Sequence, residues 1–138
     1  PVADFLDRWS DSVSGPQVSL KGGPVGIDGA IAVARLRDRL DAPVGWRPVA
    51  GRVGLLDLDT PTELVDGALL GLRVFAGYAG WGAQQLQDEI EEGSWYLVSG
   101  EETDVFAGRA DDLRHDVLRR QPGTLAWHVT RPVDPELN

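Results

Sequence analysis

One segment near the middle of the chain constrains the fold more than any other. Residues 72–76 are apolar except for Arg73, which indicates a buried strand, and they lead into the glycine-rich run GYAGWG at residues 77–82. A helical pattern follows over residues 83–92, and Gly93 supplies its stop signal. The segment therefore predicts a strand that passes through a glycine-rich turn into an amphipathic helix.

Short elements are predicted on both sides of this segment. Glycine and proline breaks and apolar spacing predict strands over residues 17–20, 30–36, 53–58, 95–98 and 125–129. The same signals predict helices over residues 2–9, from Thr60 to near Gly71, and over residues 110–120. Residues 41–51 are expected to be loop, and strands 17–20 and 30–36 to form a hairpin-like pair. This order predicts an α+β fold with a mixed, mostly antiparallel sheet.

The start of the helix expected after residue 60 has a specific signature. Thr60 can cap the helix, Pro61 fits its first position, and Glu63 can reach back to the cap N–H. We therefore expect a regular helix to follow the third strand.

Charge and composition exclude several classes of function. The 138 residues carry 13 basic and 22 acidic side chains, a net charge of −9, which opposes direct binding to nucleic acid or to an anionic membrane. The absence of cysteine excludes disulfides, zinc fingers and iron–sulfur clusters. With 42% hydrophobic residues the chain is long enough for one globular domain over residues 1–138. We expect a cytoplasmic protein.

Two motifs, in this order, carry a family resemblance. Lys21-Gly22-Gly23-Pro24-Val25 comes first, and VFAGYAGWG at residues 74–82 follows, with Gln85-Leu86 and Trp95 after it. The chain resembles the bacterial YqgE/AlgH family, although Gln87 departs from the family's QLE pattern. The resemblance implies a bent sheet that forms an incomplete barrel, flanked by about three to four short helices. It also implies a fragment that lacks the family's strand-rich N-terminal section.

The family's name reflects a proposed role in regulating alginate genes, and the resemblance implies a regulatory protein without a mechanism. If the N-terminal section is absent, apolar sheet surface is uncovered, which predicts self-association into a homo-oligomer.

The two motifs supply the candidate ligand-binding residues. A glycine-rich turn before a helix can present N–H groups to an anion, and the aromatic side chains can stack on a ligand. The candidates are Gly22, Gly23, Gly77, Tyr78, Gly80, Trp81 and Gln85. For GYAGWG the alternative is structural: the glycines permit tight packing of strand against helix and the aromatic rings fill the core. The Gly22-Gly23-Pro24 turn can lie beside this loop and help to form a pocket, or it can be only a connection between strands. Neither a GxGxxG nor a GxxxxGK[ST] motif is present, and no nucleotide or other cofactor is expected.

The helix over residues 83–92 ends in a cluster of acids. Asp88, Glu89, Glu91 and Glu92 crowd the end where the helix dipole is negative. Such a cluster can attract an arginine, a divalent cation shared by Glu89 and Glu92, or a basic protein surface. It can equally be a solvated face, and no metal site is predicted because histidine is missing from the helix.

Catalytic groups are sparse. His115 and His128 are the only histidines, and neither a GxSxG nor an SxxK motif supplies a nucleophile. Asp57 and Asp59 lie at a strand end, where they can equally just precede a helix cap. We predict no catalytic residue.

The function expected first is a non-catalytic binding or regulatory protein that acts through contacts with a protein partner. The alternative is a small-molecule binder or enzyme that uses a pocket at the GYAGW and GGPV motifs.

Overall fold

A five-stranded sheet organises the chain. The computed structural model describes residues 7–15, 17–106 and 110–130. The strands are β1 (Leu20–Lys21), β2 (Val25–Leu36), β3 (Trp46–Ala50), β4 (Val53–Leu56) and β5 (Leu69–Tyr78). Their order across the sheet is β1-β5-β2-β4-β3, and only the β1–β5 pair is parallel. The sheet does not close on itself, so the predicted α+β class with a mixed, mostly antiparallel, open sheet is confirmed.

β5 lies between the two strands that were expected to pair. Phe75 pairs with Leu20 of β1 on one side and with Ile31 of β2 on the other. The prediction of a hairpin from these two segments is therefore wrong. β1 and β2 do run antiparallel, but the connection between them at Gly22-Gly23 crosses the end of β5.

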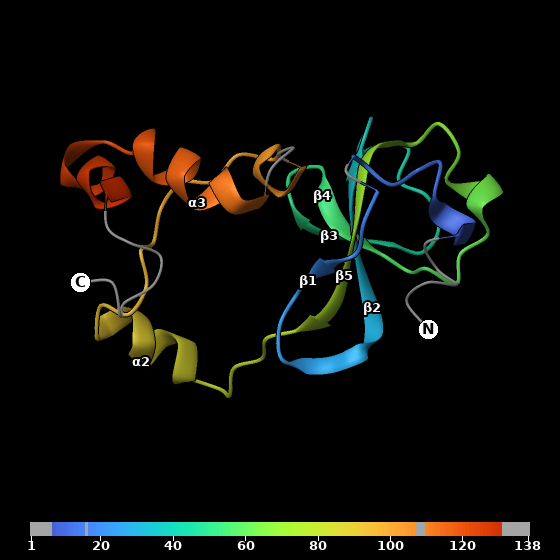
Figure 1. Cartoon of the computed structure of the whole chain (residues 1–138). Coiled ribbons are helices and arrows are strands. Elements are labelled where there is room, and N and C mark those ends of the chain that lie inside the picture. The colour runs from blue at the N-terminus through green and yellow to red at the C-terminus, as the bar shows by residue number, and fades with distance from the viewer. Residues whose placement is uncertain (1–6, 16, 107–109, 131–138) are drawn as a thin grey trace.

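The regular helices stand apart from the sheet. Helix α2 spans Gln85–Glu91 and α3 spans Ala110–Arg119, and both lie to one side of the sheet in Figure 1. Three short 3-10 segments, η1 (Thr62–Leu64), η2 (Asp104–Phe106) and η3 (Gly123–Thr130), complete the described helical structure, together with a helical turn at residues 7–9. The predicted helices at 83–92 and 110–120 are thus confirmed within a few residues, whereas residues 2–6 of the first predicted helix lie outside the described part.

The prediction of a regular helix after Thr60 is wrong. The segment forms only the single turn η1, and Pro61 occupies its N-cap position with no side-chain capping bond. Thr60 is buried against Gly45, where an added Cβ would stand 2.1 Å from the Thr60 hydroxyl oxygen. β5 then begins at Leu69, inside the range where the helix was expected.

Three further predictions of secondary structure are wrong. Residues 46–50 form β3 although Pro48 and the flanking glycines indicated a loop, because an edge strand tolerates proline. Residues 95–98 form no strand, and residues 125–129 lie in η3 instead of a strand. For residues 46–50, pairing with β4 overrides the local pattern.

The core lies against one face of the sheet. Trp9 is fully buried, and its indole N–H donates a hydrogen bond of 3.2 Å to the carbonyl oxygen of Leu58, 49 positions away. The other buried members of this cluster are Val13, Ala32, Ala34, Leu56, Leu58, Val65, Leu72 and Val74. The core thus ties the start of the described chain to β4 and leaves the segment that contains α2 outside it.

Candidate functional site

The two glycine motifs meet at the end of β5. The N–H of Gly22 donates to the carbonyl of Ala76 at 2.8 Å, which continues the β1–β5 pairing by one residue. A Cβ on Gly22 would stand 2.2 Å from the carbonyl oxygen of Gly77, and a Cβ on Gly23 would stand 2.2 Å from the carbonyl carbon of Tyr78. These glycines therefore allow one backbone to cross another at close range, and the Gly22-Gly23 turn lies beside the start of the GYAGW segment.

Tyr78 lies beside this crossing and keeps an open face. Its ring lies close to Gly26, where an added Cβ would come within 3.2 Å, and its side is flanked by Gly80. Tyr78 remains 47% exposed. The ring therefore does not fill the core, which is the role that the structural alternative gave to the aromatic residues.

The candidate site is centred on Glu89, a residue that sequence reasoning placed only in the acidic cluster. Oε2 of Glu89 accepts hydrogen bonds from the indole N–H groups of Trp95 at 2.8 Å and Trp81 at 3.1 Å. Its other oxygen, Oε1, accepts the amide of Gln85 at 2.9 Å. The two indole rings meet edge to face with centroids 5.6 Å apart. We call Trp81, Gln85, Glu89 and Trp95 the tryptophan cluster.

These donors change the acidity of Glu89. The hydrogen bond from Trp95, then that from Trp81, then that from Gln85 lower the pKa of Glu89 below its ordinary value of 4.5. The carboxylate is therefore held in its charged form, with each oxygen accepting at least one hydrogen bond. The idea that Glu89 and Glu92 share a cation gains no support, and the described residues contain no group of three potential ligands for a metal ion.

Gln85 links the cluster to the glycine turn. Its side-chain carbonyl oxygen accepts the N–H of Gly82 at 3.0 Å while its amide donates to Glu89. Gln84 precedes it with a left-handed φ of 72°, which only a well-fixed turn maintains in a residue with a side chain. The structure therefore brings Trp81 and Gln85 together, whereas Gly22 and Gly23 contact only the start of this segment.

Sequence reasoning missed Glu89 and Trp95 as members of the site. Trp81, Gln85 and Glu89 are spaced by four residues, which is the spacing of neighbours on one side of a helix and could have indicated the first part of the cluster. Trp95 returns from the other side of Gly93, whose φ of 79° ends the helix. No local pattern predicts that return.

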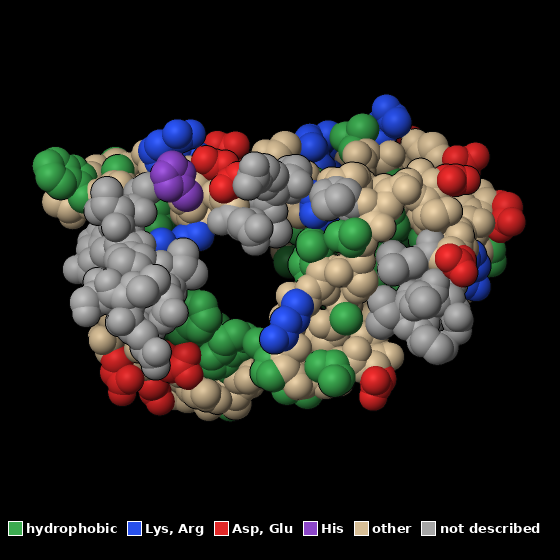
Figure 2. All heavy atoms as spheres, in the orientation of Figure 1, with side chains coloured by type: hydrophobic (Ala, Val, Ile, Leu, Met, Phe, Trp, Pro, Cys, Tyr) green, Lys and Arg blue, Asp and Glu red, His purple; other side chains and the backbone are tan. Residues whose placement is uncertain are grey.

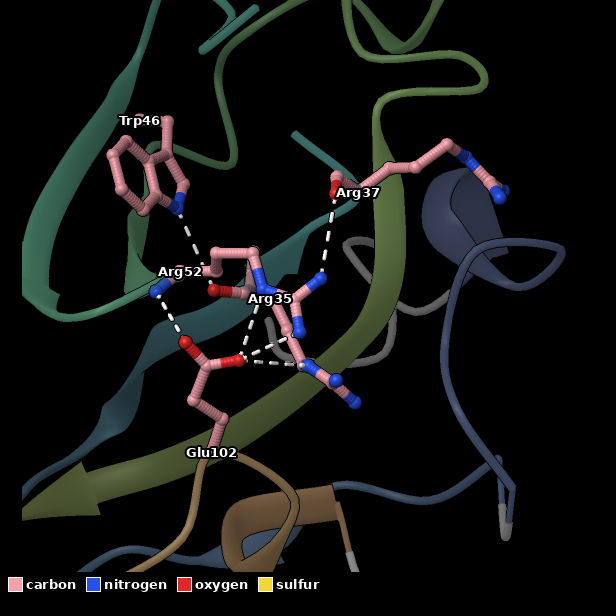
Figure 3. Close-up of polar contacts among 6 residues, drawn as sticks. Arg35, Arg37, Trp46, Arg52 and Glu102 are labelled. Atoms are coloured by element: carbon pink, nitrogen blue, oxygen red, sulfur yellow. Dashed lines mark hydrogen bonds and ion pairs between the residues drawn. The ribbon is translucent and has the colours of Figure 1, made fainter. Parts of the chain in front are cut away.

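A second polar network holds the segment after α2 against the sheet. Glu102 accepts hydrogen bonds from the backbone N–H of Arg52 at 2.8 Å and from its Nε at 3.0 Å, and Arg35 lies 3.5 Å away (Figure 3). The backbone N–H of Arg52 is the first cause, and its side chain the second, that lowers the pKa of Glu102. Glu102 therefore ties the chain that follows the tryptophan cluster to β2 and to the turn between β3 and β4.

The open cavity of the sheet lies elsewhere. A cavity of about 790 Å³ is lined by Gly29, Ala30, Ile31, Ala32, Gly45, Trp46, Arg47, Leu55, Leu56, Asp57, Leu58 and Asp59. None of the seven predicted ligand-binding residues contributes to it. Asp57 and Asp59 do, and the Asp57 carboxylate accepts the N–H of Asp59 at 2.9 Å.

The two histidines lie in α3 and η3. His115 lies on an exposed part of α3 with its Nδ1 3.7 Å from the carboxylate of Asp116. The side chain of His128 lies outside the described part of the chain. In the described residues, no helix combines the length and the apolar character that crossing a bilayer requires. The cytoplasmic location, the homo-oligomer and the absence of nucleic-acid binding stay predictions.

Known proteins are similar to this chain in sequence. A family model described as AlgH-like (DUF179) matches residues 1–126. A UPF0301 protein of Streptomyces coelicolor is 48% identical over 140 residues, which cover 99% of this chain and 72% of that protein. A UPF0301 protein of Thermobifida fusca is 44% identical over 145 residues, covering 99% of this chain and 73% of that protein.

A solved structure agrees. The crystal structure of protein DIP2367 from Corynebacterium diphtheriae superposes with a TM-score of 0.86 at 31% identity, over 94% of this chain and 69% of that one. The predicted family is confirmed by the matched residues and by the shared fold: the chain belongs to the AlgH-like family.

Proposed function

We propose that this chain is a non-catalytic regulatory protein that binds a protein partner through the surface around α2. That surface consists of the tryptophan cluster and its exposed neighbours Leu86, Tyr96 and Leu97. We call it the α2 surface. We place binding on this surface and not in a small-molecule pocket. The GYAGW and GGPV motifs contact each other through backbone, and they line no part of the open cavity.

The observation that carries the proposal is that two tryptophans are fixed in place and yet remain exposed. Trp81 is 39% and Trp95 is 45% exposed, although Glu89 holds both indoles. A tryptophan that is already ordered loses little side-chain entropy when a partner covers it. Tryptophan is also enriched among the residues that dominate binding energy in protein interfaces.

The position of α2 makes this surface accessible. Every residue from Ala79 to Gln87 is exposed, and the buried core cluster includes no residue of α2. In the space-filling view, acidic side chains gather over α2, and hydrophobic side chains lie between these acids and an opening beside the sheet (Figure 2). A partner can therefore contact apolar and acidic groups together.

The charge of the segment specifies the partner. The stretch from Ala79 to Leu97 contains four acids, Asp88, Glu89, Glu91 and Glu92, and no Lys or Arg. Its complement is a protein surface with Lys or Arg around an apolar centre, because complementary charge steers encounter and fixes orientation. A nucleic acid has the same sign of charge as α2 and is disfavoured.

The test is site-specific photo-crosslinking in cells. A photoreactive residue at Leu97, which is 78% exposed, is compared with one at Leu40, which is 91% exposed and outside the α2 surface. We expect a protein crosslinked from position 97 and absent from position 40. That protein, purified, must bind the chain directly, more weakly as salt rises, and at least about tenfold more weakly to Trp81→Ala or Trp95→Ala.

Leu40→Ala is the matched control for affinity. Equal crosslinking from both positions, or tryptophan substitutions that leave the affinity unchanged, contradicts the proposal. Native mass spectrometry of the purified chain tests the alternative: a small molecule retained by the wild type and lost in Trp81→Ala would replace protein binding with ligand binding.

A further inference from the structure

One side of β2 is left without a neighbouring strand near its beginning. β2 begins at Val25, but β4 pairs with it only from Ala32 to Arg35. Over residues 28–31, the described part of the chain places no strand on that side of β2. The backbone N–H and C=O groups of an unpaired strand edge are a template for pairing with another segment.

The open cavity lies along this same edge. Its wall includes residues 29–32 of β2, and the register aligns Ala32, Leu56 and Trp46 across three adjacent strands. Side chains that are paired in this way share one face of the sheet, and Ala30, two positions on, is on that face as well. Ala30, Ala32 and Trp46 line the cavity together, and the two alanines are its small side chains. We call the cavity and this edge of β2 the β2 notch.

The rim of the notch carries more negative than positive charge. Asp57 and Asp59 are both exposed where the chain leaves β4, and Arg47 is the single cation among the lining residues. The hydrogen bond from the Asp59 N–H to Asp57 holds the two carboxylates at one turn. A cationic side chain at the end of an occupant is therefore favoured at this turn.

We propose that the β2 notch binds an extended peptide segment of a partner protein by β-strand addition to residues 28–31. The unpaired backbone binds the peptide main chain, the Ala30–Trp46 wall takes an apolar side chain, and Asp57 and Asp59 take a Lys or Arg. The cavity of about 790 Å³ is of the size that proteins use to enclose a ligand, roughly 300–1,000 Å³. This site is independent of the α2 surface, because the two share no residue.

The first experiment uses labelled synthetic peptides and the full chain. Two seven-residue peptides of alternating Val and Thr are used, one with an Arg at its N-terminus and one with an Arg at its C-terminus. Binding of each labelled peptide to the chain is measured by fluorescence anisotropy. Each peptide is also made in two N-methylated forms, one with the odd and one with the even amides blocked. Since alternate N–H groups of a strand point to opposite sides, we expect one form to bind at least about tenfold more weakly than the other.

The second experiment locates the peptide on the chain. We expect the amides of residues 28–31 that point away from β5 to exchange rapidly in the free protein and slowly with peptide bound. Asp59→Asn should weaken binding of the Arg-containing peptides, while Asp66→Asn, which removes an exposed acid outside the notch, should not. Ala30→Trp should fill the notch and block binding. If Ala30→Trp fails to fold, Asp59→Asn still tests the site, because asparagine has nearly the same size as aspartate.

Several results would overturn the proposal. The two N-methylated forms could bind with equal affinity, or amide exchange at residues 28–31 could stay unchanged when peptide is added. The third such result is that none of the peptides binds at concentrations up to about 1 mM, where a Kd corresponds to a binding free energy of about −4 kcal/mol. Analytical ultracentrifugation that shows a dimer broken by Ala30→Trp would assign the notch to a second copy of the chain instead. Loss of the α2 surface by Trp95→Ala should leave peptide binding intact, so failure of either proposal is recognised separately.

Discussion

The indole N–H of Trp95 donates a hydrogen bond of 2.8 Å to the carboxylate of Glu89, across the glycine that ends α2. This bond turns an acidic helix end into a support for two exposed aromatic rings. Trp95 also brings its ring against that of Trp81, so both indoles share one acceptor. The order of the α2 surface therefore depends on one charged group.

Protonation of Glu89 should release both indoles. Its hydrogen bonds lower the pKa of Glu89 in the folded state, so their contribution is complete above the ordinary value of 4.5 and is lost as the pH falls through the lower, folded pKa. We expect the indole N–H resonances of Trp81 and Trp95 to shift together in that acidic range. In Glu89→Gln this transition should be absent, and in Glu91→Gln it should remain. Resonances that shift identically in Glu89→Gln would contradict the role of this carboxylate.

Replacing Gly77 should destabilise the sheet. Gly77 has a φ of 71°, and an added Cβ would stand 2.7 Å from the carbonyl oxygen of Gly23. The left-handed backbone alone costs roughly 1–2 kcal/mol for a residue with a side chain, and the contact adds to this. We expect Gly77→Ala to lower the free energy of unfolding in urea by about 2 kcal/mol or more.

Gly15→Ala is the matched control for this substitution. Gly15 has no positive φ, and nothing lies within 4 Å of a Cβ placed there. Its free energy of unfolding should stay within about 0.5 kcal/mol of the wild type. Similar values for the two variants would show that the backbone crossing at Gly77 does not limit the fold.

Removing the Trp9 side chain should be more damaging than removing an exposed one. Trp9 is fully buried and bonded to the carbonyl of Leu58, so truncation leaves a cavity and an unpaired oxygen. Trp9→Ala should cost about 3–5 kcal/mol of unfolding free energy, measured by urea denaturation. Leu40→Ala, at a side chain that is 91% exposed, should change it by less than about 0.5 kcal/mol. A small loss for Trp9→Ala would place the core elsewhere.

Loss of the Glu102 anchor should loosen the segment between α2 and α3. Glu102 accepts hydrogen bonds from both the backbone and the side chain of Arg52, which hold residues near 102 against the turn between β3 and β4. In Glu102→Gln we expect faster amide exchange over residues 99–106 and at Arg52, with β2 and β5 unchanged. Glu63→Gln, at an exposed acid in η1, should leave exchange in that segment unaltered. Uniform acceleration across the sheet would instead indicate a global loss of stability.

Several local features could be read from sequence, and the structure explains why. Gly93 ends α2 because it adopts a positive φ, and the apolar run at residues 72–76 is the centre of β5. Both signals act within a few residues. The Thr60 signature is equally local, yet it produced no full helix because Thr60 is buried against Gly45 and β5 starts soon after.

The structure brings some of the candidate residues together. Trp81 and Gln85 do belong to one cluster, and Gly22, Gly23 and Gly77 do meet. The central acceptor Glu89 and its second indole, Trp95, were not predicted, because their contact spans a helix end and an irregular segment. Binding of a ligand by any of these residues remains a prediction.

The sequence by itself determined the α+β class, the family, the two motifs and the positions where most elements begin and end, since these depend on nearby residues and on their apolar spacing. Only the tertiary structure decided that β5 lies between β1 and β2, that Glu102 binds Arg52, and that Trp95 returns to Glu89. Such pairings join segments that are distant or separated by irregular chain. Their free energy depends on loop closure and on what else is buried with them, which no local pattern encodes.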